Sequence, residues 1–166
     1  MSVEFEGLEE IIENLGKIVD PKKIKKSVGL ACALVERTAK QKAPKGSGDL
    51  RRSITSNVND IGGTITGVVY TPLEYAPYVE YGTGIHAEKE GRKGWWVYVE
   101  GSEKKGTGGK HYTELEAKEV CEYLRSKGLD AYATNGREPT PFMRPALYEN
   151  KAEIKRILRG GIKKND

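Results

Sequence analysis

The glycine-rich segment GSEKKGTGGK at residues 101–110 comes closest to a motif that does chemistry, because a glycine loop ending in Gly-Lys can cradle phosphates. That motif needs a glycine five residues before the Gly-Lys pair and a serine or threonine after it. Lys104 and His111 occupy these two positions. We therefore predict a flexible loop and no nucleotide site, and the GTG at 82–84 likewise lacks the third glycine of a dinucleotide fingerprint.

Nucleophilic and metal-binding side chains are present but do not cluster at a useful spacing. His86 and His111 lie in loop-like sequence, without the spacing that places two ligands on one helix face. Cys32 and Cys121 are far apart and have no Cys-x-x-Cys partner, which is typical of a reducing compartment and indicates packing rather than catalysis. We predict no catalytic, cofactor-binding or metal-binding residue and expect no enzyme.

The length and charge of the chain are typical of one domain with an insertion: 166 residues with a formal net charge of +4. The N-terminus is acidic where a signal peptide is basic, and no apolar run approaches the roughly 20 residues of a membrane span. We therefore expect a soluble protein that has no membrane partner. The excess positive charge lies at the C-terminal end. Five bases there could face DNA: Lys155, Arg156, Arg159, Lys163 and Lys164.

Two helices are predicted in the first quarter of the chain. Apolar residues at helical spacing indicate a short amphipathic helix over residues 8–19. Asp20 can cap a second helix and Pro21 suits its first position, so a long helix should run to Lys42, where an Ala-Pro pair ends it. Its apolar positions form one stripe: Ile24, Val28, Ala31, Val35 and Ala39.

A loop and a hairpin are predicted next. Residues 42–49 combine glycine with charge, and we expect a mobile loop that becomes ordered on assembly. Residues 51–71 alternate in the manner of two strands around Gly62-Gly63, which predicts an antiparallel hairpin.

The segment YAPYVEYGTG at residues 75–84 predicts a short helix. Pro77 suits its first turn, and Gly82 can end it in the left-handed conformation. Tyr75, Tyr78 and Tyr81 then share one side of the helix. Each tyrosine has an apolar ring and a polar tip, so they could pack within the subunit or against a neighbour.

The second half of the chain reads as strand, helix, strand and a final helix. WWVYVEG and residues 129–134 are strand-prone, and Thr113 with Glu116 forms a capping box for the helix between them. If the two strands are parallel neighbours, their crossover should be right-handed. The last helix follows PTPFMRPAL, and Gly160-Gly161 is expected to end it.

Three segments in this order resemble a known family: ALVERTAKQKAPKGSGDLRRSI at 33–54, YAPYVEYGTG at 75–84 and PFMRPAL at 141–147. They are similar to the tail-completion or head-tail joining proteins of tailed phages and prophages. The resemblance covers residues 8–84 and 138–160. It implies a core of residues 1–84 and 138–166, with an insertion at 85–137.

The resemblance also implies the architecture and the partners. The expected fold is α+β, with a long helix packed on a small antiparallel sheet, an inserted strand-helix-strand unit and a C-terminal helix. The family implies a hexameric ring in the tail or neck of the virion, assembled in the host cytoplasm. Its neighbours would be the head-tail connector and the tail-tube or tail-terminator proteins, with DNA passing through. Assembly residues are expected among Tyr75, Tyr78, Tyr81, Lys45, Arg51, Arg52 and Arg144.

A second resemblance concerns residues 95–134. WWVYVEGS followed by EAKEVCEYLRSKGLDAYAT is similar to half of a SPOR-type peptidoglycan-binding module. Two alternatives to the connector therefore stay open. One is a small nucleic-acid-binding protein that uses the basic C-terminal helix, and the other is a cell-wall glycan-binding module in the insertion.

Overall fold

The computed structural model describes residues 20–101 and 111–162, which fold as α+β. Within these ranges there are six α-helices and two antiparallel two-stranded sheets, which confirms the predicted fold class. The chain forms two compact units, one of residues 1–73 with 142–166 and one of residues 74–141. The predicted helix at 8–19, the loop at 102–110 and the bases Lys163 and Lys164 lie outside the described residues.

Helix α2 (Pro21–Lys42) is the longest element of the first unit and has the predicted bounds. The Asp20 carboxylate accepts a hydrogen bond from the Lys22 N–H at 2.9 Å, and Pro21 occupies the first turn, where no N–H donor is lost. The predicted stripe is largely buried: Ala31, Val35 and Ala39 lie in the core together with Cys32.

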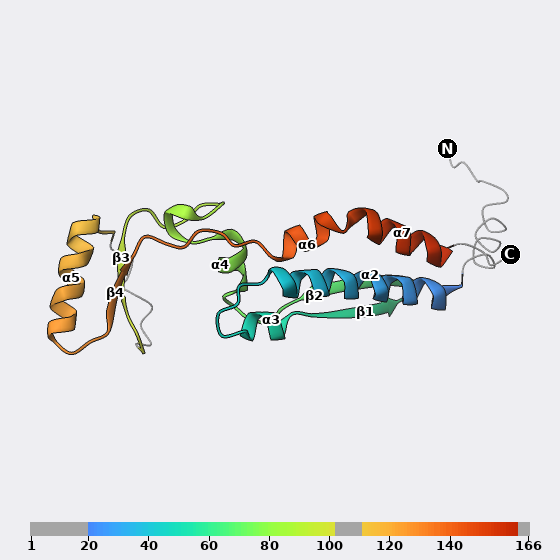
Figure 1. Ribbon diagram of the computed structural model, residues 1–166, viewed down its shortest axis with the longest axis horizontal. Helices are drawn as coiled ribbons and strands as arrows, with labels where there is room; N and C mark the ends of the chain where they lie inside the picture. The colour runs from blue at the N-terminus through green and yellow to red at the C-terminus, as the bar shows by residue number, and fades with distance from the viewer. Residues whose placement is uncertain (1–19, 102–110, 163–166) are drawn as a thin grey trace, which may run out of the picture. The chain divides into compact units, whose positions relative to one another are not determined.

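The first unit is built around α2, which packs against the hairpin on one side and against two C-terminal helices on the other (Figure 1). The hairpin consists of β1 (Thr55–Ile61) and β2 (Thr64–Tyr70). Gly62 and Gly63 both have positive φ, as the tight two-residue turn requires, and the register pairs Ile61 with Thr64. The predicted hairpin is confirmed.

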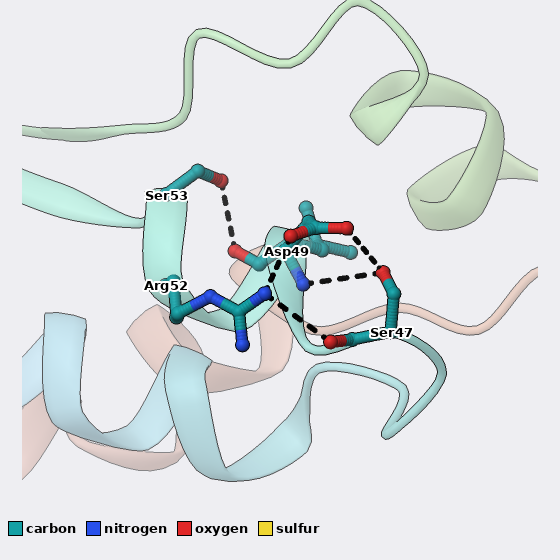
Figure 2. Close-up of polar contacts among 5 residues, drawn as sticks. Ser47, Asp49, Arg52 and Ser53 are labelled. Atoms are coloured by element: carbon teal, nitrogen blue, oxygen red, sulfur yellow. Dashed lines mark hydrogen bonds and ion pairs between the residues drawn. The ribbon is translucent and has the colours of Figure 1, made fainter.

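The residues that lead into the hairpin differ from the prediction. Residues 51–53 were expected to start the first strand, but they belong to a short helix, α3 (Asp49–Ser53). Its side chains bond locally: the Ser53 hydroxyl donates to the Leu50 carbonyl, and Arg52 reaches Asp49 one turn back (Figure 2). These local hydrogen bonds favour a helical turn over an extended strand at residues 49–53. The strand therefore begins only at Thr55.

The C-terminal helix is divided into α6 (Met143–Glu149) and α7 (Lys151–Ile162). At the break, Asn150 Nδ2 donates to Thr38 Oγ1 of α2 at 3.0 Å and to the Ala146 carbonyl at 2.8 Å. The expectation that Gly160-Gly161 ends the helix is wrong, because α7 continues to Ile162. Gly161 is buried against Ser27 of α2, so its missing side chain serves close helix packing.

The second unit holds α4 (Ala76–Tyr81), the short 3-10 helix η1 (Gly84–His86), β3 (Trp96–Val99), α5 (Glu114–Ser126) and β4 (Ala131–Thr134). Thr113 and Glu116 form the predicted capping box at the start of α5. Helix α5 lies beside the two strands (Figure 1). Their shared core consists of Val97, Ala117, Cys121 and Ala131.

Three details of this unit correct the sequence predictions. Strands β3 and β4 pair antiparallel, so the right-handed crossover of a parallel pair does not apply. Strand β4 begins at Ala131 rather than 129, because the Leu129 N–H bonds to the Leu124 carbonyl at the end of α5. Gly82 follows α4 with φ +74° and ψ 177°, which is not the left-handed helical conformation, and a Cβ added there would meet the carbonyls of His86 and Arg137.

Candidate assembly interface

The three tyrosines of the YAPYVEYGTG segment lie on the solvent side of α4. Tyr75, Tyr78 and Tyr81 are 43%, 62% and 39% exposed, whereas Ala76 and Val79 are buried. The helix therefore buries its small and branched residues and leaves the aromatic rings accessible. Exposed tyrosines grouped on one helix are typical of protein-protein interfaces, where tyrosine is enriched.

The predicted basic residues of the first unit divide between α3 and the loop before it. Lys45, Arg51 and Arg52 are exposed. Arg52 Nη2 forms an ion pair with Asp49 Oδ1 at 2.5 Å and also donates to the Ser47 carbonyl (Figure 2). The hydrogen bond from Ser47 and the Arg52 guanidinium hold the pKa of Asp49 below its usual value. The paired Arg52 is a helix-stabilising residue as well as a candidate contact, while Arg51 lines a hollow beside Arg37 and Lys40.

Arg144 belongs to another element, α6, where it is half-buried and lines an apolar groove. The groove has a volume of about 610 Å³ and lies over α2, between β2 and the helices α6 and α7. Its α2 residues are Val28, Ala31, Cys32 and Val35. The groove could not be predicted from the sequence, because its existence depends on the distance between β2 and the C-terminal helices.

Three of the bases predicted to face DNA lie on the described part of α7, where they are exposed and border a common hollow: Lys155, Arg156 and Arg159. Arg156 forms an ion pair with Glu153 one turn earlier, which holds the pKa of that carboxyl below its usual value. This exposed pair places a carboxylate beside one of the bases predicted to face DNA.

A second exposed surface was not predicted as such, although the alternation in WVYV and AYAT could have indicated it. Val97 and Ala131 face α5, so the other side of the β3–β4 sheet carries Trp96, Tyr98 and Tyr132, here called the aromatic face. The rings of Tyr98 and Tyr132 are stacked with centroids 5.4 Å apart. Tyr98 and Tyr132 are 42% and 39% exposed.

Cations and a carboxylate border the aromatic face. The Arg92 guanidinium lies 5.1 Å from the centre of the Trp96 ring, and that of Arg125 lies 5.7 Å from Tyr132. The Glu100 carboxylate raises the pKa of Tyr132. Trp95, in contrast, packs against the core, and its main chain forms an isolated antiparallel β-bridge with Tyr112. The two adjacent tryptophans therefore have different environments.

Glu36 joins α2 to the hairpin and was not singled out from the sequence. Its carboxylate accepts hydrogen bonds from Lys40 Nζ and from the Ser56 hydroxyl, both at 2.6 Å. These two bonds lower the pKa of Glu36. Burial and the nearby Glu36 raise the pKa of Cys32, so this thiol stays protonated and packs as a small apolar side chain.

The candidate residues are divided between the two units. The tyrosines of α4 and the aromatic face belong to the unit of residues 74–141, whereas Lys45, Arg51, Arg52 and Arg144 belong to the other. Within the first unit, Arg51 and Arg52 are neighbours on α3, and Arg144 lies on α6. In the described part of the chain, no helix is long and apolar enough to cross a membrane.

Comparison with known proteins finds a family match for the first half of the chain. Residues 8–82 match the family model described as "Bacteriophage HK97-gp10, putative tail-component". No curated protein and no solved structure matches the chain. The match includes α2, α3, the hairpin and the three tyrosines of α4. Over residues 8–82 the chain is therefore similar to a family of phage tail components, which confirms the resemblance seen in its motifs.

Proposed function

We propose that this chain is a structural virion protein of a tailed phage or prophage that completes the tail or joins it to the head. The observation that carries the proposal is the family match over residues 8–82. The ordered motifs at 33–54, 75–84 and 141–147 add the finer role, because they resemble tail-completion and head-tail joining proteins. The role requires no catalysis and no cofactor.

The proposed assembly is a ring, with a hexamer matching the symmetry of the tail. A ring with head-to-tail contacts needs two different and complementary surfaces on each subunit. The tyrosines of α4 supply one candidate surface, and the exposed bases Lys45 and Arg51 supply another of different chemistry. The partners in the virion would be the connector and the tail-tube or tail-terminator proteins.

The direct test uses a charge placed on the α4 tyrosines. Tyr78→Asp should leave the fold intact, because the ring is 62% exposed, but should prevent rings or joined complexes when the chain is mixed with its neighbours. Tyr123→Asp on α5 is the matched control, since Tyr123 lies in the same unit and is 63% exposed. Sizing and negative-stain imaging measure the outcome. If both variants assemble as the wild type does, the α4 tyrosines are not part of the interface.

We also propose a second candidate function for residues 74–141, the binding of a cell-wall glycan. The aromatic face favours it, because the exposed rings of Tyr98 and Tyr132 and the half-buried ring of Trp96, flanked by two arginines, form a platform on which a sugar ring can stack. In a pull-down, immobilised glycan strands should retain the wild-type protein but not the double variant in which Trp96 and Tyr132 are changed to alanine. Tyr123→Ala should bind like the wild type. Equal retention of all three proteins would remove this candidate.

The nucleic-acid alternative makes a separate prediction for α7. Binding through Lys155, Arg156 and Arg159 should weaken steeply with salt, because condensed counterions are released from the DNA. Charge-neutral variants of Lys155 and Arg159 should reduce the slope. An affinity that does not change with salt would exclude this function.

A further inference from the structure

The outer edge of β2 presents main-chain groups in a regular pattern. Ile61 and Thr64 close the two-residue turn and exchange hydrogen bonds, so bonded and non-bonded pairs alternate along the hairpin. The N–H and C=O groups of Thr64, Thr66, Val68 and Tyr70 therefore point toward β1. Those of Ile65, Gly67 and Val69 point the other way, toward the free edge of the strand.

This free edge borders the apolar groove. Five consecutive β2 residues, 65–69, line the groove. Successive side chains of a strand point to opposite faces, so a groove that touches all five must run along the edge of the strand. Among the described residues, β2 pairs with β1 alone, and no hydrogen bond is found for the outward groups of Ile65, Gly67 and Val69. The groove is thus a slot beside an unpaired strand.

The edge of β2 has none of the features that protect strand edges. Its sequence, TITGVVY, contains no charged residue and no proline, the two features that most often prevent strand addition. The floor of the slot is the apolar side of α2, and Leu147, Ile154 and Leu158 form its far wall. An extended chain with alternating apolar residues would fit both the hydrogen-bonding edge and the apolar floor.

The chain itself contains such a segment. Residues 2–6, SVEFE, alternate Val3 and Phe5 with Glu4 and Glu6, which is the pattern of a strand with one apolar and one polar face. This segment lies outside the described residues. As a third strand, it would place Val3 and Phe5 on α2 and leave the two glutamates in solvent.

The tether is long enough for residues 2–6 to reach the slot of the same subunit. The groove begins at Val28, which lies about 12 Å along α2 from Asp20. The 13 residues from 7 to 19 span about 20 Å as a helix and about 43 Å when extended. A segment tethered at this distance has an effective concentration in the millimolar range, which favours pairing within one chain.

We propose that residues 2–6 pair with the free edge of β2 in the same subunit, as a third strand that fills the groove over α2. The proposal does not depend on the role of the protein in the virion. It assigns the outward N–H groups of Ile65, Gly67 and Val69 to hydrogen bonds with this segment.

Amide hydrogen exchange of single residues, followed by NMR on the full-length chain, tests the proposal. In the wild type, the amides of Ile65, Gly67 and Val69 should be protected. In the double variant Val3→Asp and Phe5→Asp, these amides should exchange at least about tenfold faster, because the charged residues cannot enter the apolar slot. The amides of Thr66 and Val68, bonded to β1, should exchange at the same rate in both proteins and show that the hairpin remains folded.

The matched control is the double variant Glu4→Gln and Glu6→Gln, which changes only the solvent side of the proposed strand. In this variant the amides of Ile65, Gly67 and Val69 should be as protected from exchange as in the wild type. Equal exchange of the Ile65, Gly67 and Val69 amides in the wild type and the Asp variant would overturn the proposal. Protection that disappears on dilution would assign the strand to a second copy and overturn the pairing within one subunit.

Discussion

Gly161 of α7 lies against Ser27 of α2 so closely that a Cβ at position 161 would overlap the serine hydroxyl. Both residues are buried, at the place where α7 crosses the first half of α2. The adjacent Gly160 faces open space, with nothing within 4 Å of an added Cβ. Two neighbouring glycines therefore have opposite roles, which makes them a matched pair for mutation.

Gly161→Ala should destabilise the first unit by about 1–3 kcal/mol, because the extra methyl group forces α2 and α7 apart. Gly160→Ala should be neutral or stabilise by up to about 1 kcal/mol, since alanine favours a helix more than glycine does. Urea unfolding followed by circular dichroism measures both. An equal loss of unfolding free energy in both variants would show that α7 does not pack closely on α2 at Gly161.

Gly67→Ala should also be destabilising, by about 1–3 kcal/mol, for a reason specific to the hairpin. A Cβ at position 67 would meet the side chains of Cys32 and Val28 on α2. Adding Cys32→Ala should restore part of the loss, because the smaller side chain makes room for the methyl group. A double-mutant cycle with independent, additive effects would contradict this contact.

Thr113→Ala should lower the stability of the second unit by about 1 kcal/mol, because it removes half of the capping box of α5. Thr113→Ser keeps the hydroxyl and should retain most of the stability. The two tryptophans of the chain, Trp95 and Trp96, both belong to this unit, so their fluorescence follows its unfolding. An unchanged transition in the alanine variant would show that the cap contributes nothing.

The stability of the first unit should depend on pH through Glu36. The folded chain lowers the pKa of this carboxyl through Lys40 and Ser56, so the stabilisation is complete above the unfolded pKa, about 4.3. The stabilisation is lost as the pH falls through the lower, folded pKa. Ser56→Ala should cost about 1–2 kcal/mol at pH 7, and this difference from the wild type should shrink in acid.

Ser53→Ala is the control for this pH dependence. The Ser53 hydroxyl bonds to the Leu50 carbonyl and to Thr71, which are both neutral. The loss of unfolding free energy caused by Ser53→Ala should therefore be the same at every pH at which the chain is folded. Unfolding midpoints measured between pH 3 and pH 7 compare the two variants, and parallel curves for Ser56→Ala and Ser53→Ala would contradict the role of Glu36.

The elements that the sequence predicted well have their own local signals. Asp20 and Pro21 set the start of α2, the pair Gly62-Gly63 sets the hairpin turn, and Thr113 with Glu116 starts α5. Each signal acts within a few residues, so no tertiary contact is needed to read it. Two features of the C-terminal helix that were predicted incorrectly depend on distant partners: the break at Asn150 on Thr38, and the continuation of α7 through Gly161 on Ser27.

The candidate surfaces were predictable only in part, for the same reason. The sequence placed Tyr75, Tyr78 and Tyr81 on one side of a helix, but that this side faces solvent depends on the packing of Ala76 and Val79. The apolar groove lies between β2 and α7, which are more than eighty residues apart in the chain. The difference between Trp95 and Trp96 follows from which side of β3 meets α5.

The central claim, that this chain joins or completes the tail, is tested most directly by reconstituting particles. Phage produced without the chain should yield separate heads and tails in electron micrographs, and the purified wild-type protein should restore joined particles. Mass spectrometry of those particles should detect the chain. Joined particles at full yield in its absence, with no peptide of the chain in wild-type virions, would contradict the account.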